Sequence, residues 1–138
     1  TPVTFETVLS GGGFAAIFRY FSRSKTAKTP EIAQIEMEQN DLYRQQTLSL
    51  LGWFLGLFVG TLELVFMPKG GIWIGGGVIK KNLALFSGDF LDDFWSGVAC
   101  SPAYTLQREM FPIGVLKSDH SIYVGGAFYA HNMCTQKL

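Results

Sequence analysis

Two glycine triplets are the residues of this sequence whose type and spacing could most directly build a binding site. They consist of Gly11, Gly12 and Gly13, and of Gly75, Gly76 and Gly77. The second triplet follows the apolar run IWI, and a strand that enters a glycine-rich turn and then a helix is typical of nucleotide sites. Backbone without side chains could form a flat wall that suits an adenosine moiety. Alternatively, the glycines only let a helix and a strand approach each other.

The second triplet completes neither of the common phosphate-binding motifs. Lys80 and Lys81 are out of register with GxxxxGK[ST], and no Ser or Thr follows them. The triplet also lacks the later glycine of GxGxxG. The glycines alone therefore leave the ligand open.

Acidic side chains are the candidates for a general base. Those considered are Asp89, Asp92, Asp93 and Asp119. The first three fall on a short amphipathic segment, where a solvated face is expected, and Asp119 suits the start of a helix. Because no Ser-His-Asp arrangement with an elbow motif is present, hydrolase chemistry is unsupported.

The cysteine, histidine and charge content of the sequence argues against several other kinds of binding site. Cys100 and Cys134 form no CxxC pair, and together with His120 and His131 their spacing fits no common zinc finger. We therefore expect two free thiols and no metal site. The formal net charge is zero, which gives no electrostatic case for binding nucleic acid or an anionic membrane surface.

Residues 48–67 raise the question of a membrane span. They are about as long as a spanning helix and place Gly52, Gly56 and Gly60 at four-residue spacing, as in closely packed membrane helices. Glu63 would be costly in hydrocarbon. We favour a buried central helix whose glycines press against a sheet, with a small membrane protein as the alternative.

The apolar pattern predicts an α/β arrangement of helices and strands. Thr29, Pro30 and Glu31 form a helix start, and Asn40 or Asp41 caps the next helix. Helices are expected at 12–23, 30–39, 42–66, 78–86, 89–97 and 121–133, buried strands at 71–75 and 111–117, a loop or short extended piece over 1–13, and irregular structure at 99–110. We expect the two strands to be neighbours in one sheet that the helix 42–66 covers.

Three motifs in this order resemble the bacterial-type glucokinase family. They are LSGGG at 9–13, GGIWIGGGVIKKNLALF at 70–86 and FPIGVLKSDHSIYVGGAFYA at 111–130. The resemblance implies part of an actin-like (ribonuclease-H-like) ATPase domain, a mixed sheet with flanking helices. It also implies that residues 1–138 are the C-terminal part of the large domain and that an N-terminal half is absent.

The resemblance further implies a function and a division of labour. The family transfers a phosphoryl group from ATP, with Mg²⁺, to the 6-hydroxyl of glucose in the cytoplasm. Glu6 matches the acid that hydrogen-bonds the sugar, whereas by itself it would pass for an ordinary exposed acid. The residues that match glycines on the adenosine side of the cleft are Gly11, Gly12, Gly13, Gly75, Gly76 and Gly77. The expected partners are glucose and ATP, and neither nucleic acid nor a membrane. A homodimer is one assembly that the resemblance allows.

Several family motifs are missing from this sequence. The Asp-Gly-Gly-Thr phosphate loop, the Asn-Asp pair that holds the base and a Gly-Glu-Gly-His sugar motif do not occur. Phosphoryl transfer depends on such positioning and charge stabilisation, so we expect no catalytic residue in this chain and no activity of the chain alone. A non-catalytic scaffold with a kinase-like fold is the remaining alternative.

Overall fold

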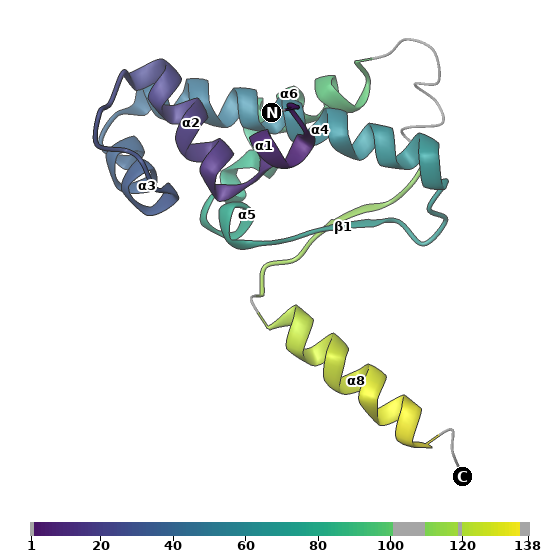
Figure 1. Cartoon of the computed structure of the whole chain (residues 1–138). Helices are drawn as coiled ribbons and strands as arrows, with labels where there is room; N and C mark the ends of the chain where they lie inside the picture. Colours follow the sequence, from purple (N-terminus) through teal and green to yellow (C-terminus); the bar gives the residue numbers. More distant parts are fainter. Residues whose placement is uncertain (1, 101–109, 119, 136–138) are drawn as a thin grey trace.

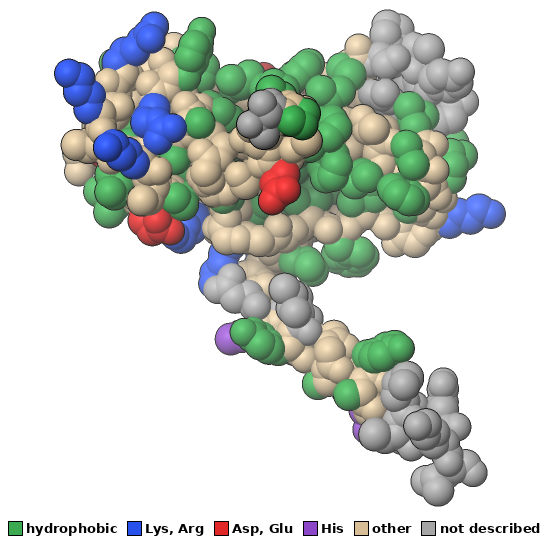
Figure 2. Space-filling view, viewed as in Figure 1, with side chains coloured by type: hydrophobic (Ala, Val, Ile, Leu, Met, Phe, Trp, Pro, Cys, Tyr) green, Lys and Arg blue, Asp and Glu red, His purple; other side chains and the backbone are tan. Residues whose placement is uncertain are grey.

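The chain is a helix-rich α/β protein, seen here in a computed structural model that describes residues 2–100, 110–118 and 120–135. Its elements are α1 (Phe5–Leu9), α2 (Gly11–Ser22), α3 (Pro30–Glu38), α4 (Asp41–Phe66), β1 (Ile72–Ile74), α5 (Gly77–Lys81), the 3₁₀ helix η1 (Leu83–Phe86), α6 (Gly88–Val98), β2 (Ile113–Val115) and α8 (Ser121–Thr135). Helices α1 to α6 gather on one side of β1, and α8 projects away from them (Figure 1). Apolar side chains follow the exposed surface of α8 (Figure 2).

The two described strands form a parallel pair. Trp73 lies opposite Gly114 in the register, and the backbone N–H of Leu116 donates to the carbonyl oxygen of Ile74 at 2.8 Å. The expectation that 71–75 and 111–117 are neighbours in one sheet is confirmed. The expected mixed sheet is not observed among the described residues, which contain only this parallel pair.

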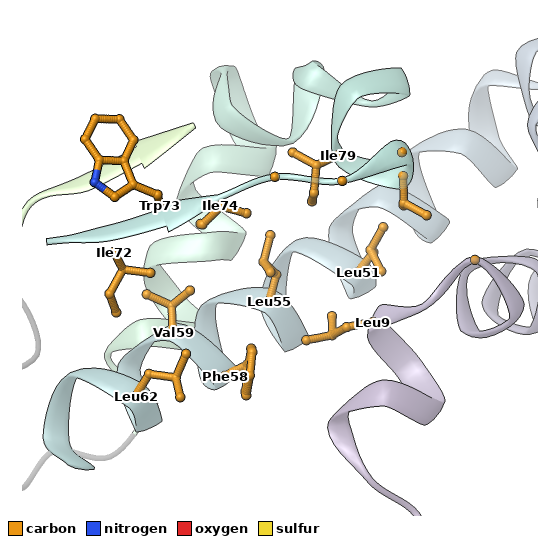
Figure 3. Close-up of a pocket in the computed structure, with 15 residues that line it drawn as sticks. Leu9, Leu51, Leu55, Phe58, Val59, Leu62, Ile72, Trp73, Ile74 and Ile79 are labelled. Carbon is orange, nitrogen blue, oxygen red and sulfur yellow. The ribbon is translucent and has the colours of Figure 1, made fainter. Parts of the chain in front are cut away.

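Helix α4 runs through the centre of the helical layer and covers one face of β1. Leu55 and Val59 of α4 face Ile72 and Ile74 of the strand (Figure 3). The other sides of α4 pack against α2 and α6. The core accordingly contains buried side chains from all of these elements: Phe14, Phe18, Leu48, Leu51, Leu55, Val59, Ile74, Phe94 and Val98.

By length and composition, α4 could also cross a membrane. A core helix of a folded domain passes the same test, and here Leu48, Leu51 and Glu63 are buried within the protein. An apolar helix surrounded by other elements of its own chain is the expected form of a core helix. The packing therefore favours the interpretation as a central helix.

Gly52 and Gly56 of α4 lie against α6 and not against the sheet, which corrects the expectation for these two glycines. A Cβ built on Gly56 would lie 1.9 Å from the carbonyl oxygen of Phe94 in α6. A Cβ on Gly97 of α6 would lie 2.1 Å from the carbonyl oxygen of Trp53 in α4. The backbones of α4 and α6 are thus in direct contact.

Three local expectations differ from the structure. Residues 5–9 form the short helix α1, whose start is closed by the backbone N–H of Thr4 donating to Oγ1 of Thr7 at 3.1 Å. The helix expected at 78–86 is divided into α5 and η1 at Asn82, which leaves helical geometry. Strand β1 is not buried on both faces, because Trp73 is 68% exposed.

The other predicted helices and caps are confirmed with small shifts of their ends. The hydroxyl of Thr29 accepts from the backbone N–H of Ile32 at the start of α3, and Asn40 caps α4 through Tyr43. Helices are also found where 12–23, 89–97 and 121–133 predicted them. Most of the segment expected to be irregular at 99–110 lies outside the described residues.

Candidate functional site

The second glycine triplet forms the turn between β1 and α5. Gly75 follows the strand, Gly76 has a φ of +115° as the N-cap residue of α5, and Gly77 begins the helix. A side chain would strain the backbone at Gly76, whereas Gly77 carries no such constraint. A Cβ on either residue would meet no atom within 4 Å, so this turn presents bare backbone to open space.

The first glycine triplet opens α2, and its three members differ in their surroundings. The hydroxyl of Ser10, the N-cap residue, accepts from the backbone N–H of Gly13 at 3.1 Å. Gly13 is buried, and a Cβ there would lie 2.2 Å from the carbonyl oxygen of Val8, so the close approach of α1 explains this glycine. Gly12 is exposed, and only Gly11 reaches the cavity described next.

Gly11 and the turn of Gly75, Gly76 and Gly77 line one cavity of about 400 Å³. It lies between α4 and β1, and its remaining walls are apolar (Figure 3). These walls come from Leu9, Leu51, Leu55, Phe58, Val59, Leu62, Ile72, Trp73, Ile74, Val78 and Ile79. The structure therefore brings together four of the six glycines predicted for the nucleotide, next to apolar surface that suits a ring.

A second cavity of about 270 Å³ shares Gly11, Gly77 and Val78 with the first and has both polar and apolar side chains in its lining. The polar side chains come from α3 and from the end of α5: Glu31, Gln34, Lys81 and Asn82. Nδ2 of the buried Asn82 donates to Oε1 of Gln34 and to the carbonyl oxygen of Val78, each at 3.0 Å. This amide ties α3 to the helix that follows the glycine turn.

Glu31 is held in its charged form at the edge of this second cavity. Hydrogen bonds from its own backbone N–H and from the Thr29 hydroxyl lower the pKa of Glu31, and the charge of Lys81 contributes a smaller lowering. Sequence reasoning missed this polar group. The available signal was that Lys81 and Asn82 directly follow the glycine turn, and that Glu31 and Gln34 fall on one face of a helix.

The structure places the predicted sugar ligand apart from the two cavities. Glu6 is an exposed residue of α1 and lines neither of them. Its helix is nevertheless joined to α2 through the single residue Ser10. The glycine wall and Glu6 therefore lie on adjacent elements without sharing a cavity.

The described aspartates among the candidate bases, Asp89, Asp92 and Asp93, line neither cavity. Asp89 and Asp92 are exposed, and Oδ2 of Asp93 accepts from the hydroxyl of Ser49 at 2.5 Å. Asp119 lies outside the described residues. Within the described ranges, no group of three or more His, Cys, Asp or Glu side chains could hold a metal ion.

These features define an α/β protein with a candidate ligand site at the carboxyl end of a parallel strand, next to a helix N-terminus. The family model described as Glucokinase matches residues 1–133. The chain therefore belongs to the glucokinase family, as the motifs indicated.

The chain is similar to glucokinases of several bacteria. It is 30% identical over 131 residues to that of Saccharophagus degradans, which covers 91% of this chain and 40% of that protein. It is 29% identical over 136 residues to that of Mesorhizobium japonicum, covering 94% and 39%, and 27% identical over 154 residues to that of Nostoc punctiforme, covering 93% and 44%. The chain thus spans about two-fifths of the length of these curated relatives. No solved structure matches it significantly.

Proposed function

We propose that this chain is the C-terminal part of the large domain of a glucokinase and supplies the adenosine side of its nucleotide site. The proposed reaction is phosphoryl transfer from ATP to the 6-hydroxyl of glucose, in the cytoplasm, by a protein of the actin-like ATPase fold. Family membership supports the reaction. Because the chain matches only about two-fifths of each relative, we propose that the other groups needed for the reaction come from residues outside this chain.

The observation that carries the proposal is the meeting of Gly11 with the turn of Gly75, Gly76 and Gly77 around one cavity. Its volume of about 400 Å³ is within the range of pockets for small molecules. An adenine ring fits apolar walls and bare backbone, and the adjoining cavity offers Glu31 and Gln34 to ribose hydroxyls. The described residues offer no carboxylate cluster for Mg²⁺, so the role that we propose for them is nucleotide binding alone.

Glu6 is proposed as a ligand of glucose. A carboxylate can accept two charge-assisted hydrogen bonds from adjacent hydroxyls, and the exposed position of Glu6 leaves it accessible. Its place on α1, next to the helix that carries Gly11, would put sugar and nucleotide on neighbouring elements. Phosphoryl transfer requires the two bound substrates to lie close to each other in this way.

Binding of a fluorescent ATP analogue to the purified chain tests the nucleotide site. Gly77→Val places a side chain in the open space of the turn without an unusual φ, and Gly70→Val does the same outside both cavities. We expect the first variant to weaken binding at least tenfold and the second to leave it unchanged. Equal affinities for both variants, or no binding by the unaltered chain, would remove the cavity from the proposal.

A further inference from the structure

Helix α8 is apolar on most of its circumference and has no extensive packing within the described chain. Tyr123 and Phe128 are 75% and 67% exposed, and Val124 and Tyr129 are equally open. At 100° per residue, these four side chains spread over about two-thirds of the helix circumference. A helix that is apolar nearly all round is normally buried on several sides, yet α8 stands apart from the other elements (Figure 1).

The β1–β2 pair has a second uncovered apolar surface. Trp73 points away from α4, opposite to Ile72 (Figure 3), and its ring lies so close to Gly114 that a Cβ there would meet it at 2.5 Å. Parallel sheets are almost always covered on both faces. In Figure 1, α4 lies on one side of β1 and α8 on the other, so both uncovered surfaces belong to the side away from α4.

We infer that α8 and the Trp73 face together form the docking surface for the remainder of a glucokinase-type chain. The inference rests on the proposal that this chain is one part of a glucokinase, and it goes further by naming the surface of contact. About three-fifths of each relative lies outside the match, which is enough polypeptide to cover a sheet face and surround a helix.

A second copy of this chain fits the surface less well. Two helices that pair by symmetry cover one stripe on each other, because close packing of two helices uses a single face. Such a pair would leave at least one of the four apolar side chains in solvent, because they spread over more of the circumference than one stripe covers. A larger body that encloses α8 and reaches Trp73 covers both.

Association in two pieces tests the inference directly. The tagged chain is mixed with the part of the Saccharophagus degradans glucokinase that it does not match, and the matched segment of that glucokinase serves as the positive control. The test variant is Tyr123→Lys with Phe128→Lys. The control variant is Ile35→Lys with Leu42→Lys, since these side chains are 59% and 60% exposed on α3 and α4.

We expect the chain to bind the remainder, the α8 variant to bind at least tenfold more weakly and the control variant to bind normally. Hydrogen exchange should slow on association at residues 72–74 and 120–131. Binding by the positive control but not by the chain would overturn the inference, as would equal loss in both variants. A dimer of the chain alone that the α8 variant dissolves would name a second copy as the occupant. ATP binding by the chain is measured separately, so the nucleotide proposal and this inference can fail independently.

Discussion

Gly56 of α4 and Phe94 of α6 are in backbone contact, since a Cβ on the glycine would lie 1.9 Å from the phenylalanine carbonyl oxygen. This contact fixes the distance between α4 and α6, the two helices of the layer that pack most extensively against each other. Because α6 lies in the crossover between β1 and β2, the same contact holds that crossover against α4. The contact also explains the glycine spacing in residues 48–67 by the packing of two helices of the same chain.

Gly56→Ala should therefore destabilise the protein. No side chain can move aside to admit the new methyl group, so α6 must shift, at a cost of about 1–3 kcal/mol or more. Gly52→Ala is the matched control, because its nearest neighbour outside the helix is at 3.4 Å, and the better helix propensity of alanine should add up to about 1 kcal/mol. Urea unfolding of both variants would measure this difference. Equal effects of the two substitutions would contradict the contact.

Local features of the fold were predictable from the sequence, whereas contacts such as that between Gly56 and Phe94 were not. The caps at Thr29 and Asn40 were predictable because they depend on residues three positions apart. The spacing of Gly52 and Gly56 indicated a close approach but could not identify the approaching element, which depends on the tertiary fold. The exposure of Trp73 was equally out of reach, since an apolar strand sequence does not state which of its faces is covered.

A second prediction concerns the hydrogen bond between Ser49 and Asp93. The hydroxyl donates to the carboxylate at 2.5 Å across the α4–α6 contact. Ser49→Ala should cost about 1 kcal/mol of unfolding free energy. In a double-mutant cycle with Asp93→Ala, the second substitution should add little to the first. Asp92→Ala, at an exposed position of the same helix, should stay within about 0.5 kcal/mol of the parent, and independent effects at 49 and 93 would refute the pairing.

A third prediction concerns the pH dependence of the loop before α3. Hydrogen bonds from the hydroxyls of Thr26, mainly, and Ser24 lower the pKa of Glu36. A carboxyl group whose pKa is depressed on folding stabilises the folded state above its unfolded pKa, and this stability is lost as the pH falls through the folded pKa. Thr26→Val should thus raise the pKa of Glu36 in an NMR titration and weaken the acid dependence of the urea midpoint. An unchanged pKa would show that this hydrogen bond does not form in solution.

The fourth prediction concerns Glu6 in the intact enzyme. Glu6→Gln keeps the size of the side chain but removes its charge, and loss of a charge-assisted hydrogen bond costs about 1.5–3 kcal/mol. Glucose affinity should fall by roughly 10- to 150-fold while ATP affinity stays nearly constant. Calorimetry with each ligand would separate the two. Unaltered glucose affinity would return Glu6 to the ordinary surface acids.

The grouping of glycines around a cavity was visible in the sequence, whereas the side chains that complete the lining were not. The cavity brought Gly11 to Gly75, Gly76 and Gly77, as the glycine wall required. Gly13 was included because a triplet does not reveal that one member is needed for the contact with Val8. The polar lining was missed because Glu31 and Lys81 approach each other only when α3 packs beside α5.

The most direct test of the proposed function is a coupled assay for glucose 6-phosphate. It is made first with the purified chain, and then with the chain plus the remainder of a glucokinase as a separate polypeptide. The proposed nucleotide wall and sugar ligand can add binding energy, but without groups that hold the phosphates and accept the proton they cannot lower the chemical barrier. We expect no turnover by the chain alone and turnover after mixing. Turnover by the chain alone would contradict this expectation.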